Sequence, residues 1–316
     1  MTLQEAVRTR PAMYLGNNGI LGLFNEVVTT CIRHCERIHV GFEIVAENDF
    51  VLTLSAQQDM SLLASCFLSD PPLPDIFFIT LLKAIASQLT IQSNDSSITI
   101  CFAIDTTILP DVVVDYLKMC EKMSLLALLN RECSILVVDK RQKYLNQIYY
   151  HFPQGIFYIF ERAMADALGK PTFIVTFDDR FGHNTYQIGI AYRSDWFPAP
   201  RTISFANDNH TIYGGSLEIG TIAGIMSACK QYIEAQHLDN HTVTRQKILH
   251  GLILVVAVRG KEFQFGGGFR DALADKQVQK EVKALVKKLV FDYLCNSKET
   301  TTDFLHRLDT ARLFSL

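Results

Sequence analysis

Hydrophobic and polar positions in the first half of the chain predict helices packed on a sheet. Residues 20 to about 38 are rich in apolar side chains, which is typical of a mostly buried helix. Apolar runs at 40–45 and 50–54 flank Glu47-Asn48-Asp49, a pattern that predicts a β-hairpin. The same reasoning predicts further helices and strands, with helices at 76–89 and 111–129 and strands at 90–92, 98–102, 134–138 and 144–150.

The second half begins after a predicted boundary near His151-Phe152-Pro153. Its expected elements are, in order, a helix at 154–168, strands at 172–177, 185–192 and 202–205, a helix at 218–235, a strand at 251–258, a helix at 276–294 and a last helix near Phe314. The run 251–258 is almost entirely apolar, as in a central strand. The apolar stripe of the 218–235 helix consists of Ile219, Ile222, Ile225, Met226, Cys229, Tyr232 and Ile233. Strands with helices segregated to one face predict an α+β domain.

Composition narrows the class of protein. The chain has 316 residues, of which 48% are hydrophobic, and this length predicts two domains that each bury a core. The net charge of −3 argues against a general attraction to nucleic acid or to an anionic membrane. The eight cysteines are scattered and no secretory leader is recognisable, so we expect reduced thiols in a cytoplasmic protein. The longest apolar runs, 76–82 and 252–258, are too short to span a bilayer, so no membrane is expected as a partner.

Three motifs carry a resemblance to a known family. A short helical turn leads into Arg8-Thr9-Arg10-Pro11-Ala12-Met13-Tyr14-Leu15-Gly16, which resembles the start of the ATPase region of DNA gyrase B and its topoisomerase IV counterpart. Gly214-Gly215-Ser216 resembles the Gly-Gly-Thr turn of the gyrase transducer domain, and 251–258 resembles that domain's Gly-Leu-x-Ala-Val-Ile-Ser-Val strand. The resemblance implies a degenerate GHKL-type domain over 1–150, with a Bergerat-type α/β sandwich. A transducer domain similar to ribosomal protein S5 domain 2 is implied over 151–316.

The resemblance also implies a nucleotide site on the first long helix. The family's Glu-Val-Val-Asp-Asn stretch corresponds to Glu26-Val27-Val28-Thr29-Thr30, so the glutamate that activates water is retained as Glu26. The magnesium-binding asparagine corresponds to Thr30, whose hydroxyl is a poorer ligand for a hard cation. The adenine-reading aspartate corresponds to Ser55, and Asp59 could replace it only after a register shift. We therefore interpret Glu26 as a vestigial general base.

The phosphate-binding parts of the implied site are missing as well. The family's glycine-rich lid corresponds in position to the apolar segment 76–82, and no glycine occurs between Gly41 and Gly155. Backbone amides can approach a phosphate only where no Cβ intervenes, so bulky side chains here oppose phosphate binding. The threonine near the adenine falls at Ile98 or Thr99.

The lysine of the transducer's Gln-Thr-Lys loop falls on the glycine run 266–268, at Gly267. Only Lys261 and Arg270 lie nearby as substitutes for that lysine.

Loss of the magnesium ligand, the adenine-reading aspartate, the lid glycines and this lysine together predicts a pseudo-ATPase, because catalytic groups act as a unit. We expect no bound cofactor and a binding or regulatory role. The expected partner is a protein, either a gyrase-like subunit or a second copy of the chain. The acidic metal-binding domain with which gyrase B helps to cut DNA is not recognisable, so DNA cleavage is not expected.

Other interpretations stay open. The chain could be the ATP-binding fragment of a type II DNA topoisomerase with a remodelled nucleotide pocket, which would use ATP and Mg²⁺. It could also bind DNA weakly through the lysines of 276–288, although these equally fit the solvated side of a helix.

The remaining polar candidates have simpler interpretations. Cys31 and Cys35 have no second ligand pair at zinc spacing, so no metal site is expected. Arg8 and Arg10 are expected to hold the N-terminus. The histidines without a catalytic partner at a suitable spacing are interpreted as solvated or hydrogen-bonded, and these are His34, His39 and His210.

Overall fold

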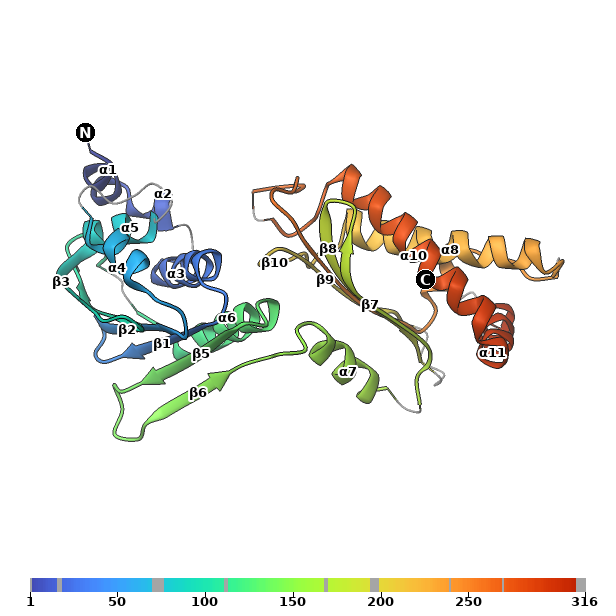
Figure 1. Cartoon of the computed structure of the whole chain (residues 1–316), viewed down its shortest axis with the longest axis horizontal. Helices are drawn as coiled ribbons and strands as arrows, with labels where there is room; N and C mark the ends of the chain where they lie inside the picture. The colour runs from blue at the N-terminus through green and yellow to red at the C-terminus, as the bar shows by residue number, and fades with distance from the viewer. Residues whose placement is uncertain are drawn as a thin grey trace. The chain divides into compact units, whose positions relative to one another are not determined.

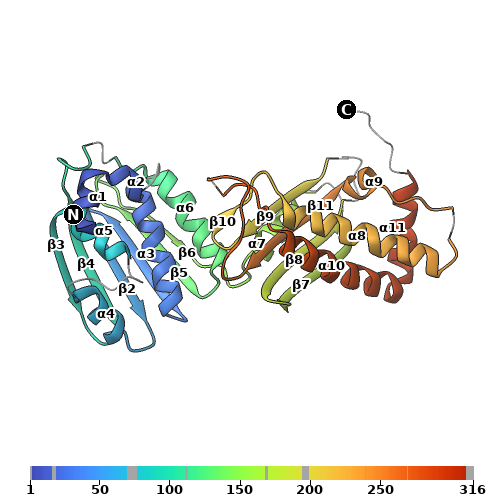
Figure 2. The ribbon, with the colours of Figure 1, turned by 90° about the horizontal axis from the view of Figure 1, so that it is seen from above.

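The computed structural model describes residues 2–15, 19–69, 77–110, 113–167, 170–193, 199–238, 240–268 and 270–310. The chain divides into two compact units, residues 1–155 and 156–316 (Figures 1 and 2). Each unit has its own hydrophobic core around its own sheet. None of the described helices is both long and apolar enough to cross a bilayer.

The first unit is a six-stranded sheet with helices on one face (Figures 1 and 2). Its elements are α1 (Leu3–Thr9), α2 (Pro11–Leu15), α3 (Ile20–His34), β1 (Ile38–Ile44), β2 (Asp49–Ala56), α4 (Ser61–Leu68), α5 (Phe77–Ile85), β3 (Ala86–Ser93), β4 (Ser97–Ile104), α6 (Tyr116–Leu129), β5 (Cys133–Asp139) and β6 (Asn146–Tyr150). The strand order is β3-β4-β2-β1-β5-β6, and β1 with β5 is the parallel pair. The predicted hairpin at Glu47-Asn48-Asp49 is confirmed by the antiparallel pairing of β1 and β2.

Alternate residues of these strands form the core beneath the helices. The ring of Phe24 on α3 lies 4.9 Å from that of Phe42 on β1 and 5.6 Å from that of Phe50 on β2. The N-terminal helix is anchored by Arg8, whose guanidinium donates to the carbonyl of Ala84 at the end of α5. This contact agrees with the expectation that Arg8 holds the N-terminus.

Three predicted helix boundaries in this unit were wrong. The helix expected at 20 to about 38 ends at His34, and β1 begins at Ile38. The helix expected at 76–89 ends at Ile85, and β3 begins at the next residue. The helix expected at 111–129 begins at Tyr116, where the Asp115 carboxylate accepts the amides of Leu117 and Lys118 as an N-cap. The expected starts of both helices, at 76 and 111, lie outside the described residues.

The second unit is a five-stranded sheet in the order β10-β9-β11-β8-β7. Its elements are α7 (Phe157–Ala165), β7 (Thr172–Phe181), β8 (Asn184–Tyr192), β9 (Arg201–Ala206), β10 (Asn209–His210), α8 (Ser216–Ala235), α9 (Arg245–Leu249), β11 (Leu252–Arg259), α10 (Lys276–Asn296) and α11 (Lys298–Thr310). Strand β11 is central and buried from Leu252 to Val258, as predicted. The expected last helix is α11, although Phe314 lies outside the described residues.

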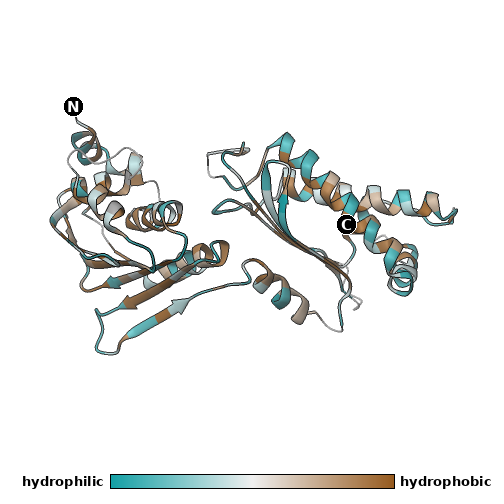
Figure 3. Ribbon diagram, viewed as in Figure 1, coloured by the Kyte–Doolittle hydropathy of each residue, from teal (hydrophilic) through white to brown (hydrophobic). Residues whose placement is uncertain are grey.

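Helices α8 and α10 cover one face of this sheet, and glycines of α8 set how closely they approach. Figure 3 shows α10 in alternating hydrophilic and hydrophobic bands, the pattern of an amphipathic helix packed on one side. A Cβ on Gly220 would lie 2.6 Å from the carbonyl oxygen of Gln279 on α10, and one on Gly224 would lie 2.9 Å from that of Lys283. The predicted α8 stripe was wrong at Ile219, which is 50% exposed. The glycines, and not that isoleucine, therefore form the contact with α10.

Helix α7 packs on the opposite face of the same sheet. The ring of Phe160 lies over Gly189 of β8, where an added Cβ would come within 2.6 Å of the ring. The expectation that all helices gather on one face was therefore wrong for α7. The α+β class is confirmed.

Candidate functional site

The structure brings two of the predicted site residues together on α3. Glu26 is half-buried, and Thr30, one helical turn later, is completely buried. The Thr30 hydroxyl has no hydrogen-bond partner among the described residues, nor do the Asn25 side-chain oxygen and the Thr29 hydroxyl on the same helix. An unsatisfied buried polar group costs about 1–3 kcal/mol. This part of α3 therefore keeps polar groups that the protein itself does not satisfy.

The helices that occupy the expected lid region are packed by aromatic side chains. Phe67 of α4 and Phe78 of α5 are both fully buried, and their ring centroids lie 5.1 Å apart. Ile79, also in the first turn of α5, is fully buried as well. Placing a phosphate among these side chains would carry a large desolvation cost.

Ser55 and Thr99 lie on the face of the sheet that points away from the helices, which we call the outer face. Leu54 of β2 and Ile98 of β4 are fully buried beneath the helices, so their neighbours Ser55 and Thr99 point to the opposite side. Glu26 therefore does not share a face of the sheet with either residue.

The other sequence candidates are also dispersed. Gly267 lies in the second unit, exposed, with open space around the position of a Cβ. Arg270 lies with its guanidinium 5.7 Å from the Phe265 ring centroid. Asp59 is exposed, and its carboxylate accepts the amide of Ser61 at the start of α4. Hydrogen bonds from Ser61 hold the pKa of Asp59 below its usual value, so this carboxylate serves the local turn.

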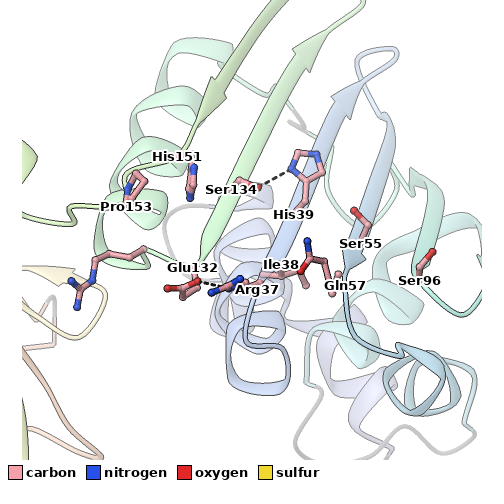
Figure 4. A pocket seen from close by; sticks show the side chains of 12 residues that line it. Arg37, Ile38, His39, Ser55, Gln57, Ser96, Glu132, Ser134, His151 and Pro153 are labelled. Atoms are coloured by element: carbon pink, nitrogen blue, oxygen red, sulfur yellow. Dashed lines mark hydrogen bonds and ion pairs between the residues drawn. The ribbon is translucent and has the colours of Figure 1, made fainter.

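A cavity of about 580 Å³ opens on the outer face of the first sheet (Figure 4). It lies where β1 and β5 begin and β2 ends, an arrangement that follows from parallel β1–β5 and antiparallel β1–β2 pairing. We call it the outer-face cavity, and its lining residues are Arg37, Ile38, His39, Ser55, Ala56, Gln57, Ser96, Arg131, Glu132, Ser134, His151 and Pro153.

Sequence reasoning missed this cavity and treated His39 as an ordinary histidine. The alternation of apolar and polar residues along these strands could have indicated the cavity. His39, Ser55 and Ser134 are the polar residues next to the buried Ile38, Leu54 and Cys133. The Nδ1 atom of His39 lies 3.0 Å from the Ser134 hydroxyl, and partial burial lowers the pKa of His39. At the rim, Arg37 Nε donates to the Glu132 carboxylate at 3.1 Å.

A second cavity, of about 470 Å³, lies in the second unit beside Glu281 of α10. Glu281 is 8% exposed, and its carboxylate accepts hydrogen bonds from Asn184, Tyr186 and Gln277 at 2.9–3.0 Å. The hydrogen bonds from Asn184 and Tyr186 join β8 to α10, so we interpret the cluster as structural.

Across the ranges that the structure describes, no group of three or more histidine, cysteine or acidic side chains is placed to hold a metal ion. Cys31 is completely buried, and burial raises the pKa of its thiol well above the usual value.

Comparison with known proteins gives a family match for the second unit. The sequence profile of the DNA gyrase B family matches residues 157–312, which form nearly all of the second unit. The second unit is similar to DNA gyrase B. The gyrase B protein of Streptococcus pneumoniae strain TIGR4 is 27% identical over 216 residues, which are 66% of this chain and 32% of that protein. The chain thus spans about a third of the length of this curated relative.

Solved structures extend the likeness to both units. Gyrase B of Myxococcus xanthus superposes with a TM-score of 0.72 at 17% identity, covering 96% of this chain and 99% of that one. The 43K ATPase domain of Thermus thermophilus gyrase B, solved with an aminocoumarin, gives a TM-score of 0.75 at 15% identity and covers 96% and 93%. The expected gyrase B-type fold is therefore confirmed over nearly the whole chain.

Proposed function

We propose that this gyrase B-like chain is a pseudo-ATPase that acts as a binding or regulatory module. The observation that carries the proposal is the buried contact between Phe67 and Phe78, in the region that the family resemblance assigns to the phosphate lid. Hydrolysis requires a positioned water, a metal and bound phosphates at the same time. Of the groups that hydrolysis needs, this chain keeps only the base that would position water, Glu26.

Two further observations support the loss of the nucleotide site. Thr30 offers one buried hydroxyl where the family has a metal-binding amide, and hard cations prefer carboxylate and carbonyl oxygens. Ser55 and Thr99, the positions assigned to adenine recognition, point to the face of the sheet that lies away from Glu26. These placements support a pocket in which the assigned residues no longer converge on one nucleotide.

The proposed partner is another protein. The curated relatives are named as a subunit of DNA gyrase, so a gyrase-like subunit or a second copy of this chain is the natural candidate. None of the eight cysteines, all of them among the described residues, is joined in a disulfide bond, which fits the reducing cytoplasm where we propose that the protein acts. Size measurements with and without a gyrase-like subunit would test the association.

Calorimetric titration of ATP and of a non-hydrolysable analogue, with and without Mg²⁺, tests the pseudo-ATPase proposal. The expected result is no magnesium-dependent binding at millimolar nucleotide and no ATP turnover. Magnesium-dependent micromolar binding, with turnover abolished in Glu26→Gln, would instead support an ATP-binding topoisomerase fragment with a remodelled pocket. Glu121→Gln is the matched control, because Glu121 is exposed on α6.

A further inference from the structure

We propose that the outer-face cavity binds a small molecule that carries a phosphate group. The cavity shares Ser55 with the positions that the resemblance assigns to the nucleotide, but it lies on the opposite face of the sheet from α3 and Glu26 (Figure 4). It therefore does not depend on whether the chain hydrolyses ATP. The argument rests on the charge, the donor groups and the size of the cavity.

The charged side chains of the cavity favour an anion. Arg37 and Arg131 line it together with a single carboxylate, that of Glu132. Arg37 pairs with Glu132 at 3.1 Å, but their side chains are 73% and 65% exposed. Exposed pairs of this kind contribute little energy, so Arg37 can turn toward a bound anion at small cost. Its planar guanidinium can then bind two oxygens of one phosphate.

Neutral donors from three elements surround the same space. Ser55 comes from β2, Ser134 from β5, and Ser96 from the turn between β3 and β4. The contact between His39 and Ser134 at 3.0 Å fixes the imidazole against the β5 hydroxyl. The Ser96 hydroxyl already donates to Asn94, and one donor is used between His39 and Ser134. The Ser55 hydroxyl, the remaining donor of the His39–Ser134 pair and the two guanidiniums still offer more donors than the two oxygens of a carboxylate can use. A phosphate presents more acceptor oxygens and matches this set better.

The size of the cavity favours a phosphate ester over free phosphate. Its volume of about 580 Å³ lies within the range of small-molecule sites, and a phosphate ion alone would leave most of it unfilled. Ala56 and Pro153 provide apolar wall for the carbon skeleton of such an ester. We therefore expect a phosphorylated metabolite of modest size to bind more tightly than inorganic phosphate.

Calorimetric titration of the full chain with ribose 5-phosphate and with inorganic phosphate tests this proposal. The test variant is Arg37→Gln/Arg131→Gln, which removes two charges from the cavity. The control variant is Arg10→Gln/Lys118→Gln, which removes two charges from exposed positions of the same unit that do not line the cavity. Thermal unfolding of each variant checks that the fold is intact.

The expected result is saturable binding of ribose 5-phosphate, tighter than that of inorganic phosphate. We expect affinity to fall about tenfold or more in the cavity variant, since charge-assisted hydrogen bonds are lost. It should be unchanged in the control variant and in Glu26→Gln. Absence of binding at millimolar ligand, or equal weakening in both double variants, would overturn the proposal. So would binding of polyglutamate that neither phosphate ligand displaces, because the cavity would then be a protein-binding surface.

Discussion

The rings of Phe67 and Phe78 meet edge to face, with centroids 5.1 Å apart and an angle of 84° between their planes. Their contact joins α4 to the first turn of α5, and neither side chain is exposed. A protein interior is packed too tightly to accept a phosphate beside such a pair without rearrangement. The fold therefore keeps its shape while this space is filled by hydrocarbon.

Phe78→Ala should be strongly destabilising because it leaves a cavity in the core of the first unit. We expect a loss of about 3–5 kcal/mol in the free energy of unfolding, measured by chemical denaturation. Leu68→Ala on α4 is the control, since Leu68 is 57% exposed and its truncation should change stability by no more than about 0.5 kcal/mol. Equal losses in the two variants would contradict the tight packing described here.

Helix and strand types followed largely from the hydrophobic pattern, but some boundaries did not. The chain passes from α5 to β3 between Ile85 and Ala86 without the glycine or proline that marks most such changes. In α8 the apolar stripe was predicted to include Ile219, yet Gly220 and Gly224 make the close contact with α10. Glycine has no hydropathy signal, so a contact of this kind depends on tertiary packing that the sequence pattern does not contain.

The candidate site was predictable only where spacing along one helix determines geometry. Glu26 and Thr30 lie one turn apart on α3, as their spacing requires. Ser55 and Thr99 could not be assigned to a face beforehand, because a shift of one residue moves every side chain of a strand to the other side. The outer-face cavity depends on the pairing of β1 with β5, which are distant in sequence.

Gly220→Ala should loosen the contact between α8 and α10. An added Cβ would lie 2.5 Å from a Val282 methyl carbon and 2.6 Å from the Gln279 carbonyl oxygen, so the helices must move apart. Overpacking costs about 1–3 kcal/mol. The better helix propensity of alanine offsets up to about 1 kcal/mol of this cost. We therefore expect a net loss of stability.

Gly267→Ala is the matched control for this prediction, because the position is open and its φ angle is not positive. Its stability should be unchanged or slightly raised, since alanine restricts the unfolded chain. Urea unfolding measured on both variants separates these outcomes. A neutral Gly220→Ala would show that the two helices tolerate a wider separation than the structure has.

Thr30→Val should raise stability by about 1 kcal/mol. The substitution preserves shape and removes a buried hydroxyl that has no partner among the described residues, whose burial costs about 1–3 kcal/mol. Thr221→Val is the control, because Thr221 is equally buried in a helix but its hydroxyl donates to the Leu217 carbonyl at 2.8 Å. That variant should instead lose about 1 kcal/mol. A loss of stability in Thr30→Val would indicate that an unseen group satisfies the hydroxyl.

Glu281→Gln should change both the stability of the chain and its pH dependence. Burial raises the pKa of Glu281, but hydrogen bonds from Gln277, Asn184 and Tyr186 outweigh that effect and lower it overall. A carboxyl whose pKa is lower in the folded state stabilises the fold above its unfolded pKa, and the contribution is lost as the pH falls through the folded value. At neutral pH the variant should lose about 1–3 kcal/mol, because an amide nitrogen replaces one carboxylate oxygen and faces the donor or donors that this oxygen accepted.

Denaturation measured at a series of pH values from about 7 down to about 3 spans the ordinary titration of glutamate and tests the linkage. The stability of the unmodified chain should fall more steeply over this range than that of Glu281→Gln, since the variant has no carboxyl to protonate at this position. The two curves should therefore approach each other in acid. Glu121→Gln should run parallel to the unmodified chain, because Glu121 is exposed on α6. Parallel curves for Glu281→Gln as well would mean that this carboxyl contributes no pH-dependent stability.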